Sequence, residues 1–242
     1  MNNLQREKLL EFISTFYGYG DLKSNIWFIG MEEGGGNTLE EVNARIQAWV
    51  TDGKNITADI FSIHQAISQT EYFNFPKPKL QRTWAKLIRM QLALEAQTVT
   101  SELVAEFQAK RLGRLSKNTC LLELLPLPAP NLNSWCYSEL TQIAFLESRS
   151  AYKKEMLPKR ISGLRQLIRK HKPEYVIFYG KSYQPYWRQI AGCKLKPIEG
   201  SKLFFGHDTD TCFVMAPHPV ARGVKNSDFE LHENLFFNFR HK

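Results

Sequence analysis

Two segments far apart in the chain each place a reactive side chain just after an apolar run. Residues 25–30 read NIWFIG and are followed by Glu32, and residues 212–216 read CFVMA and are followed by His218. A carboxylate can activate water or stabilise positive charge, and an imidazole can donate a hydrogen bond to a developing anion. The two side chains could therefore work on one substrate if the fold brings these segments together.

The elements that must position these residues are predicted to be strands of a parallel sheet. Each candidate strand is a short apolar run bounded by polar or turn residues, and the four candidates are 25–30, 118–125, 174–179 and 211–216. The long helical intervals between them imply crossover connections and a parallel sheet. In such a sheet, the loops after the carboxyl ends of the strands converge on one crevice, where ligands bind.

Helical periodicity fills the intervals between the predicted strands. Apolar residues repeat at helical spacing over 80–88 and over 157–168, where Pro158 would lie near a helix start and Pro173 just past its end. Residues 1–16 mix charged and apolar side chains, which is typical of an amphipathic helix and not of a signal peptide.

The domain organisation is predicted to be simple. No internal repeat, low-complexity tract or linker interrupts the chain, so residues 1–242 are expected to form a single domain. Helices are expected near 39–50 and 57–69. The stretch 37–76 that contains them could be an insertion that covers the site.

The composition is that of a globular protein with a basic surplus. Hydrophobic residues make up 43% of the chain, as is normal for a globular protein. The net charge of +8 favours a polyanionic partner. The four cysteines form no CxxC pair, so no zinc or iron–sulfur site and no cofactor is expected. No apolar stretch reaches the roughly 20 residues needed to cross a bilayer. We expect a soluble, cytoplasmic protein.

Four motifs in order resemble those of the uracil-DNA glycosylase superfamily. They are the loop GMEEG at 30–34, the run LLELLPLPAP at 121–130, the strand and turn VIFYGK at 176–181, and the dipeptide His218-Pro219. The resemblance spans nearly the whole chain. It implies a three-layer α/β/α sandwich around a central four-stranded parallel sheet, and a monomeric enzyme that flips a base out of double-stranded DNA.

The resemblance assigns the catalytic roles to Glu32 and His218. Glu32 would activate water or stabilise the oxocarbenium-like sugar, and His218 would stabilise the departing base. Gly30, Met31 and Glu33 of the same loop would contact the substrate. Glu33 competes for the carboxylate role, although it could instead cap a helix amino terminus, where negative charge is favourable.

Glu123 departs from the family pattern in an informative way. Members that excise uracil commonly carry asparagine at this strand end, which can both donate and accept, whereas an ionised carboxylate only accepts. A carboxylate suits the exocyclic amine of cytosine better than O4 of uracil. The substrate is therefore expected to be a cytosine-like base, such as hydroxymethylated or glucosylated cytosine in phage DNA. The competing interpretation is that Glu123 forms a structural ion pair.

Other side chains are candidates for holding the flipped nucleotide and the DNA backbone. Phe73 or Phe75 could stack on the base, or could pack in the core. Val220 and Arg222 could fill the space that the base leaves, or could lie in a solvated loop. The residues expected to contact DNA are Lys77, Lys79, Lys181, Ser182, Val220, Arg222 and Lys225.

Two alternatives remain open from the sequence. A nucleotide-handling enzyme could use the three glycines at 34–36 near a phosphate, although no GxGxxG or GxxxxGK[ST] pattern is present. A non-catalytic DNA-binding or damage-sensing module could also keep the fold without turnover. Repair of uracil and defence against modified phage DNA would require similar chemistry.

Overall fold

Eight strands form one mixed sheet in the order β3-β1-β4-β2-β5-β8-β7-β6. The computed structural model describes residues 3–116, 118–140 and 142–230, so the last part of the predicted domain, 231–242, lies outside the described residues. The strands are β1 (Gly18–Gly20), β2 (Ile26–Gly30), β3 (Thr57–Ala58), β4 (Cys120–Glu123), β5 (Tyr175–Tyr179), β6 (Lys196–Pro197), β7 (Phe204–His207) and β8 (Cys212–Ala216).

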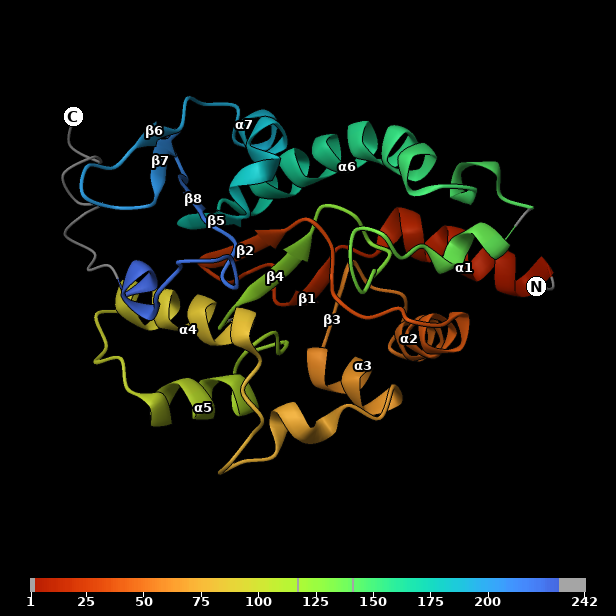
Figure 1. The fold of residues 1–242 in the computed structure, drawn as a ribbon, viewed down its shortest axis with the longest axis horizontal. Coiled ribbons are helices and arrows are strands. Elements are labelled where there is room, and N and C mark those ends of the chain that lie inside the picture. The colour runs from red at the N-terminus through yellow and green to blue at the C-terminus, as the bar shows by residue number, and fades with distance from the viewer. Residues whose placement is uncertain (1–2, 117, 141, 231–242) are drawn as a thin grey trace.

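Helices pack on both faces of this sheet (Figure 1). Figure 1 shows α6 and α7 on one face, and α4 and α5 on the other. The α-helices are α1 (Asn3–Thr15), α2 (Leu39–Thr51), α3 (Ile60–Ala66), α4 (Arg82–Leu94), α5 (Ser101–Lys110), α6 (Arg149–His171) and α7 (Gln184–Ala191). The 3₁₀ turns are η1 (Thr70–Phe73), η2 (Cys136–Glu139), η3 (Ala144–Leu146), η4 (Lys181–Tyr183) and η5 (Asn226–Phe229). The predicted α/β class is confirmed.

The extent of the predicted sheet is wrong, although its centre lies where the sequence placed it. The neighbours β4, β2, β5 and β8 are mutually parallel and coincide with the four predicted strands. The sheet has four further strands, of which β1 pairs antiparallel with β4, and β7 antiparallel with β8. These four strands have only two to four residues each and were not predicted, because runs this short do not by themselves show a period.

Helix α6 begins earlier than its prolines suggested. It begins at Arg149, where the Ser148 side chain accepts a hydrogen bond from the backbone N–H of Ala151 at 3.1 Å. Pro158 therefore lies inside the helix and not near its start. The helix ends as predicted before Pro173.

The segment 37–76 contributes to both the helical layer and the sheet. It contains α2 and α3 close to the predicted helices, and β3 between them pairs with β1 at the edge of the sheet. Its status as an insertion stays a prediction. Among the described residues, no helix has both the length and the apolar character needed to span a membrane.

Candidate active site

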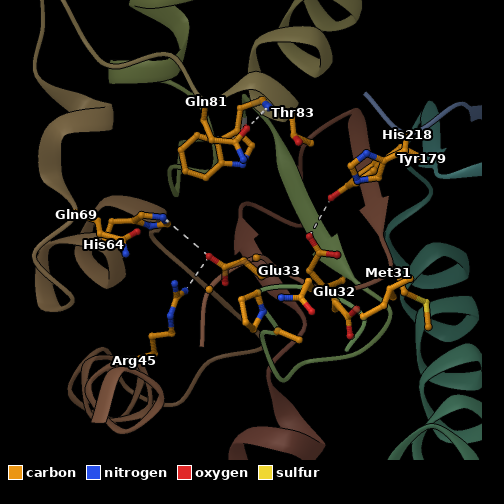
Figure 2. Close-up of a pocket in the computed structure, with 18 of the residues that line it drawn as sticks. Met31, Glu32, Glu33, Arg45, His64, Gln69, Gln81, Thr83, Tyr179 and His218 are labelled. Atoms are coloured by element: carbon orange, nitrogen blue, oxygen red, sulfur yellow. Dashed lines mark hydrogen bonds and ion pairs between the residues drawn. The ribbon is translucent and has the colours of Figure 1, made fainter. Parts of the chain in front are cut away.

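A cavity of about 490 Å³ opens at the carboxyl ends of the central parallel strands. Glu32 after β2, Glu123 at the end of β4, Tyr179 at the end of β5 and His218 after β8 all line it. In Figure 2, His218 and Tyr179 lie on one side of the site, and His64 lies on the other. The acid and the imidazole singled out in the sequence therefore share one cavity.

The register of the strands explains why these side chains meet. Gly30 lies beside Glu123 in the β2–β4 pair, and Tyr179 lies beside Ala216 in the β5–β8 pair. A Cβ atom at Gly30 would come within 2.2 Å of the Tyr179 hydroxyl and 2.5 Å of Glu123 Oε2. Glycine at the end of β2 is therefore required for Tyr179 and Glu123 to reach each other.

Glu32 forms an ion pair with an arginine from helix α6. Arg149, the first residue of α6, forms an ion pair with Glu32 Oε1 and also donates to the carbonyl of Asn131 at 3.2 Å. Glu32 Oε2 is buried and has no hydrogen-bond partner among the described residues. Leaving a buried acceptor unpaired costs about 1–3 kcal/mol, which a donor bound in the cavity would recover.

Glu33 has a different environment from its neighbour. It accepts a hydrogen bond from the Tyr19 hydroxyl at 2.6 Å and pairs with Arg45 at 2.8 Å, while His64 Nε2 lies 3.9 Å away. Glu33 is thus held by an ion pair, whereas the alternative considered from the sequence was a helix cap. Burial lowers the pKa of His64. His64 is not among the residues singled out in the sequence, and it lines the cavity.

Replacing Glu33 by glutamine should therefore affect stability first. Arg45 is 3% exposed and would lose one of its two carboxylate partners, keeping only Glu41. Breaking fully buried pairs costs about 3–5 kcal/mol, so we expect about 2–3 kcal/mol here because Glu33 stays partly exposed. Urea denaturation of wild type and Glu33→Gln measures this. An unchanged midpoint would contradict the structural role.

Glu123 is a neutral carboxyl group in this site. Burial raises its pKa to about 8, and the hydrogen bond that Tyr179 donates to Oε1 at 3.0 Å opposes the rise only in part. The other oxygen, Oε2, is buried without a partner among the described residues. The preference for a cytosine-like base in the Glu123 comparison assumes an ionised carboxylate. Burial overturns that premise, because a protonated carboxyl can donate as well as accept.

The raised pKa predicts how stability depends on pH. Between the ordinary value of 4.5 and about 8, the unfolded chain loses the Glu123 proton while the folded chain keeps it, so stability falls as pH rises through this window. Glu123→Gln removes this dependence. We expect the variant to gain about 2–5 kcal/mol over wild type between pH 5 and pH 8.5, measured by chemical denaturation. A stability difference between Glu123→Gln and wild type that does not change with pH would contradict the raised pKa of Glu123.

His218 is oriented by its own loop. The backbone N–H of Val220 donates to His218 Nδ1 at 3.4 Å, so the neutral ring carries its proton on Nε2. Burial lowers the pKa of His218, which favours the neutral ring. The ring also contacts Tyr179 edge-on, with ring centroids 6.0 Å apart. His218 is thus a neutral hydrogen-bond donor.

The aromatic residues proposed to stack on a base are not the ones that line the cavity. Phe73 is buried and packs against Phe61 and Trp84, and Phe75 is exposed beneath the Lys110 ammonium. Phe73 therefore takes the core-packing alternative that the sequence left open, and neither phenylalanine lines the cavity. The tyrosine and tryptophan residues in the cavity wall are Tyr72, Trp84, Tyr179 and Tyr183.

The predicted DNA contacts divide into two groups. Lys181, Ser182 and Arg222 line a second cavity of about 330 Å³ that shares His218 with the first. The other members are exposed elsewhere on the surface, where Lys79 pairs with Glu71 at 3.4 Å; they are Lys77, Lys79, Val220 and Lys225.

In the glycine loop at 34–36, the last amide is already hydrogen-bonded. The Glu41 carboxylate accepts hydrogen bonds from the N–H groups of Gly36 at 2.9 Å and Asn37 at 3.0 Å. These two amides are therefore not free to bind a phosphate. The nucleotide-handling alternative loses its main support.

Sequence reasoning missed two residues that support the site. Arg160 is 1% exposed and donates to the carbonyls of Glu123 at 2.9 Å and Leu124 at 3.0 Å. Its spacing from Met156 and Leu164 on the buried face of α6 was a usable signal. Tyr179 could have been found as the last residue of a predicted strand.

Comparisons with known proteins add no assignment to this geometry. No protein-family model matches the chain, and no curated protein matches it significantly. The candidate site therefore rests on the arrangement of Glu32, Glu123, Tyr179 and His218 around one cavity.

Proposed function

We propose that this chain is a DNA glycosylase, which flips a base out of DNA and hydrolyses its N-glycosidic bond to leave an abasic site. The observation that carries the proposal is the shared cavity of Glu32 and His218, which come from the loops after β2 and β8. The basic net charge of +8 suits a nucleic-acid partner. A cytoplasmic location and a monomeric state belong to the same proposal.

The two groups take opposite roles in the proposed reaction. Positive charge develops on the sugar as the bond to the base breaks, and Glu32 stabilises it or accepts a proton from the attacking water. Negative charge develops on the departing base, and His218 donates a hydrogen bond to it. Water supplies hydroxide to the sugar and a proton to the base, so the products are an abasic site and the free base.

The neutral Glu123 can read a pyrimidine edge with one donor and one acceptor. This pattern complements N3 and the exocyclic amine of cytosine, and equally N3–H and O4 of uracil, so Glu123 alone does not choose between them. The preference for a modified cytosine rests on the volume of the cavity and on the polar side chains in its wall. The cavity volume of about 490 Å³ is in the range that holds drug-sized ligands, and Gln69, Gln81 and Thr83 line it.

We therefore propose hydroxymethylated or glucosylated cytosine as the first substrate class and uracil as the second. A substituent on the base would occupy the side of the cavity near Tyr72 and Trp84, whose rings lie 5.6 Å apart. Excision of modified cytosine would serve defence against phage DNA, and excision of uracil would serve repair.

The test is base release from defined DNA. Duplex oligonucleotides carrying one uracil, cytosine, 5-hydroxymethylcytosine or glucosylated 5-hydroxymethylcytosine are incubated with the chain, and released bases are identified by mass. Abasic sites are detected by alkaline cleavage. Release of any one of these bases supports the glycosylase. Binding to these DNAs with no release from any of them would favour the non-catalytic binding module.

A further inference from the structure

Two histidines line opposite sides of the cavity, and they differ in what their Nε2 atoms can bind (Figure 2). His218 accepts a hydrogen bond from the Val220 N–H on Nδ1, so its Nε2 carries the proton. His64 Nδ1 lies 2.9 Å from the carbonyl oxygen of Ile60. A carbonyl can only accept, so Nδ1 carries the proton of the neutral His64 ring and Nε2 keeps a lone pair. The cavity therefore has a donor ring on one side and an acceptor ring on the other.

The His64 ring is neutral and fixed in its orientation. It is 3% exposed, and burial lowers its pKa below the ordinary 6.5. Its edge meets the rings of Tyr72, Phe73 and Trp84, with centroids between 5.3 and 6.2 Å apart. Turning the ring would break the hydrogen bond to Ile60 and disturb this packing. The acceptor on Nε2 is thus a built-in feature of the site.

The surroundings of His64 Nε2 favour a hydrogen-bond donor. Glu33 Oε1 lies 3.9 Å from Nε2, too far for a hydrogen bond, and already accepts one from Arg45 at 2.8 Å. Arg45 also pairs with Glu41 at 3.1 Å, so this cluster has two carboxylates and one guanidinium. A lone pair beside a net negative charge attracts the positive end of an O–H or N–H bond. The position is therefore suited to a donor on the molecule that the cavity binds.

We propose that His64 selects a hydroxyl-bearing substituent on the flipped base by accepting a hydrogen bond from that hydroxyl on Nε2. The inference rests on the proposed function. In that function Glu123 and His218 serve the base itself, which leaves His64 for a group attached to the base. Burial and the nearby charge of Glu33 both raise the pKa of Glu123, so the His64 side lies within electrostatic reach of the group that reads the base.

Three bases separate the possible sources of the hydroxyl. 5-Methylcytosine is close in size to 5-hydroxymethylcytosine but has no hydroxyl. Glucosylation turns the hydroxymethyl oxygen into an ether, which cannot donate, and adds the hydroxyls of the sugar. A site built around a hydrogen bond discriminates strongly against an analogue that lacks the bonding group, because its own polar atom is then left unpaired.

The experiment measures single-turnover release from duplexes that carry one of these three bases or uracil. The proteins are wild type, His64→Phe, which keeps a ring but removes the lone pair, and His64→Gln, which restores an acceptor oxygen. His171→Phe is the matched control, since His171 also lies in the last turn of a helix and contacts an aromatic ring, that of Trp27, at 5.9 Å. His171 lines neither cavity of the site. Thermal melting checks that each variant is folded.

The expected result is a change in preference and not a general loss of rate. We expect wild type to release at least one hydroxyl-bearing base about tenfold or more faster than 5-methylcytosine. His64→Phe should lose this preference, His64→Gln should recover part of it, and His171→Phe should keep it. A preference that survives in His64→Phe would overturn the proposal, as would an equal loss in His171→Phe. Release of uracil alone would leave the proposed function standing and overturn the role of His64.

A second readout does not depend on turnover. Nitrogen-15 NMR of histidine-labelled protein distinguishes protonated from unprotonated ring nitrogens. We expect the signals that disappear in His64→Phe to show the proton on Nδ1. The Nε2 signal should move with 5-hydroxymethyl-2′-deoxycytidine or its glucoside, and not with 5-methyl-2′-deoxycytidine.

The NMR result keeps the two proposals separable. A His64 proton on Nε2, or an Nε2 signal that does not distinguish the hydroxyl-bearing nucleosides from the methyl one, would overturn the role of His64. Absence of base release from every DNA would defeat the proposed function, while the NMR signals still test the contact.

Discussion

Replacing Glu32 by glutamine should lower base release by about 10³-fold while the affinity for DNA stays within a few-fold of wild type. The amide keeps the size of the side chain but cannot accept a proton from water or carry the negative charge that stabilises an oxocarbenium-like sugar. Glu32 lies in the cavity, and one of its buried oxygens has no hydrogen-bond partner among the described residues, so its loss removes a group positioned for substrate. Single-turnover excision and fluorescence anisotropy measure the two effects.

Two matched variants make the Glu32 result specific. Glu199→Gln removes an equivalent charge from an exposed position and should leave both release and binding unchanged. Glu33→Gln should lower stability without removing the reaction at a temperature where the variant is folded. Activity that survives in Glu32→Gln but disappears in folded Glu33→Gln would transfer the catalytic role to Glu33.

The sequence predicted the centre of the fold because the central strands carry their own signals. Each is an apolar run that stops at a glycine, proline or polar residue, as at Gly30 at the end of β2 and Pro217 after β8. Parallel strands end at the same edge of the sheet, so Glu32, Glu123 and His218 could be assigned to one place from their positions alone. The common cavity is consistent with that step of the reasoning.

The partners of these residues could not be predicted in the same way. Arg149, on α6, pairs with Glu32 although 117 positions separate them in the sequence. Arg45, on α2, pairs with Glu33. Only tertiary packing brings the members of each pair together. The protonation of Glu123 depends on burial, which no local pattern reports. The short edge strands β3 and β6 could not be predicted either, because two residues cannot show a period.

Removal of the His218 imidazole is the second large effect that we expect. His218→Ala should slow base release by about 10²–10³-fold, the usual cost of losing one preorganised donor to a developing anion. The loss should be greater for a cytosine-type base than for uracil, because the poorer leaving group depends more on that hydrogen bond. Single-turnover rates on paired duplexes, identical except for the target base, measure both the loss and its dependence on the base.

The protonation state of His218 gives this prediction a second test. Burial holds its pKa below the ordinary 6.5, and the Val220 N–H fixes the proton on Nε2, so the ring donates in its neutral form. Wild-type release should therefore not fall as pH rises from 6.5 to 7.5, as it would if the imidazolium were required. His207→Ala, an exposed histidine on β7, should match wild type. If His218→Ala were also to match wild type, the departing base would need another donor, and the neutral carboxyl of Glu123 is the group in the cavity wall that could supply one.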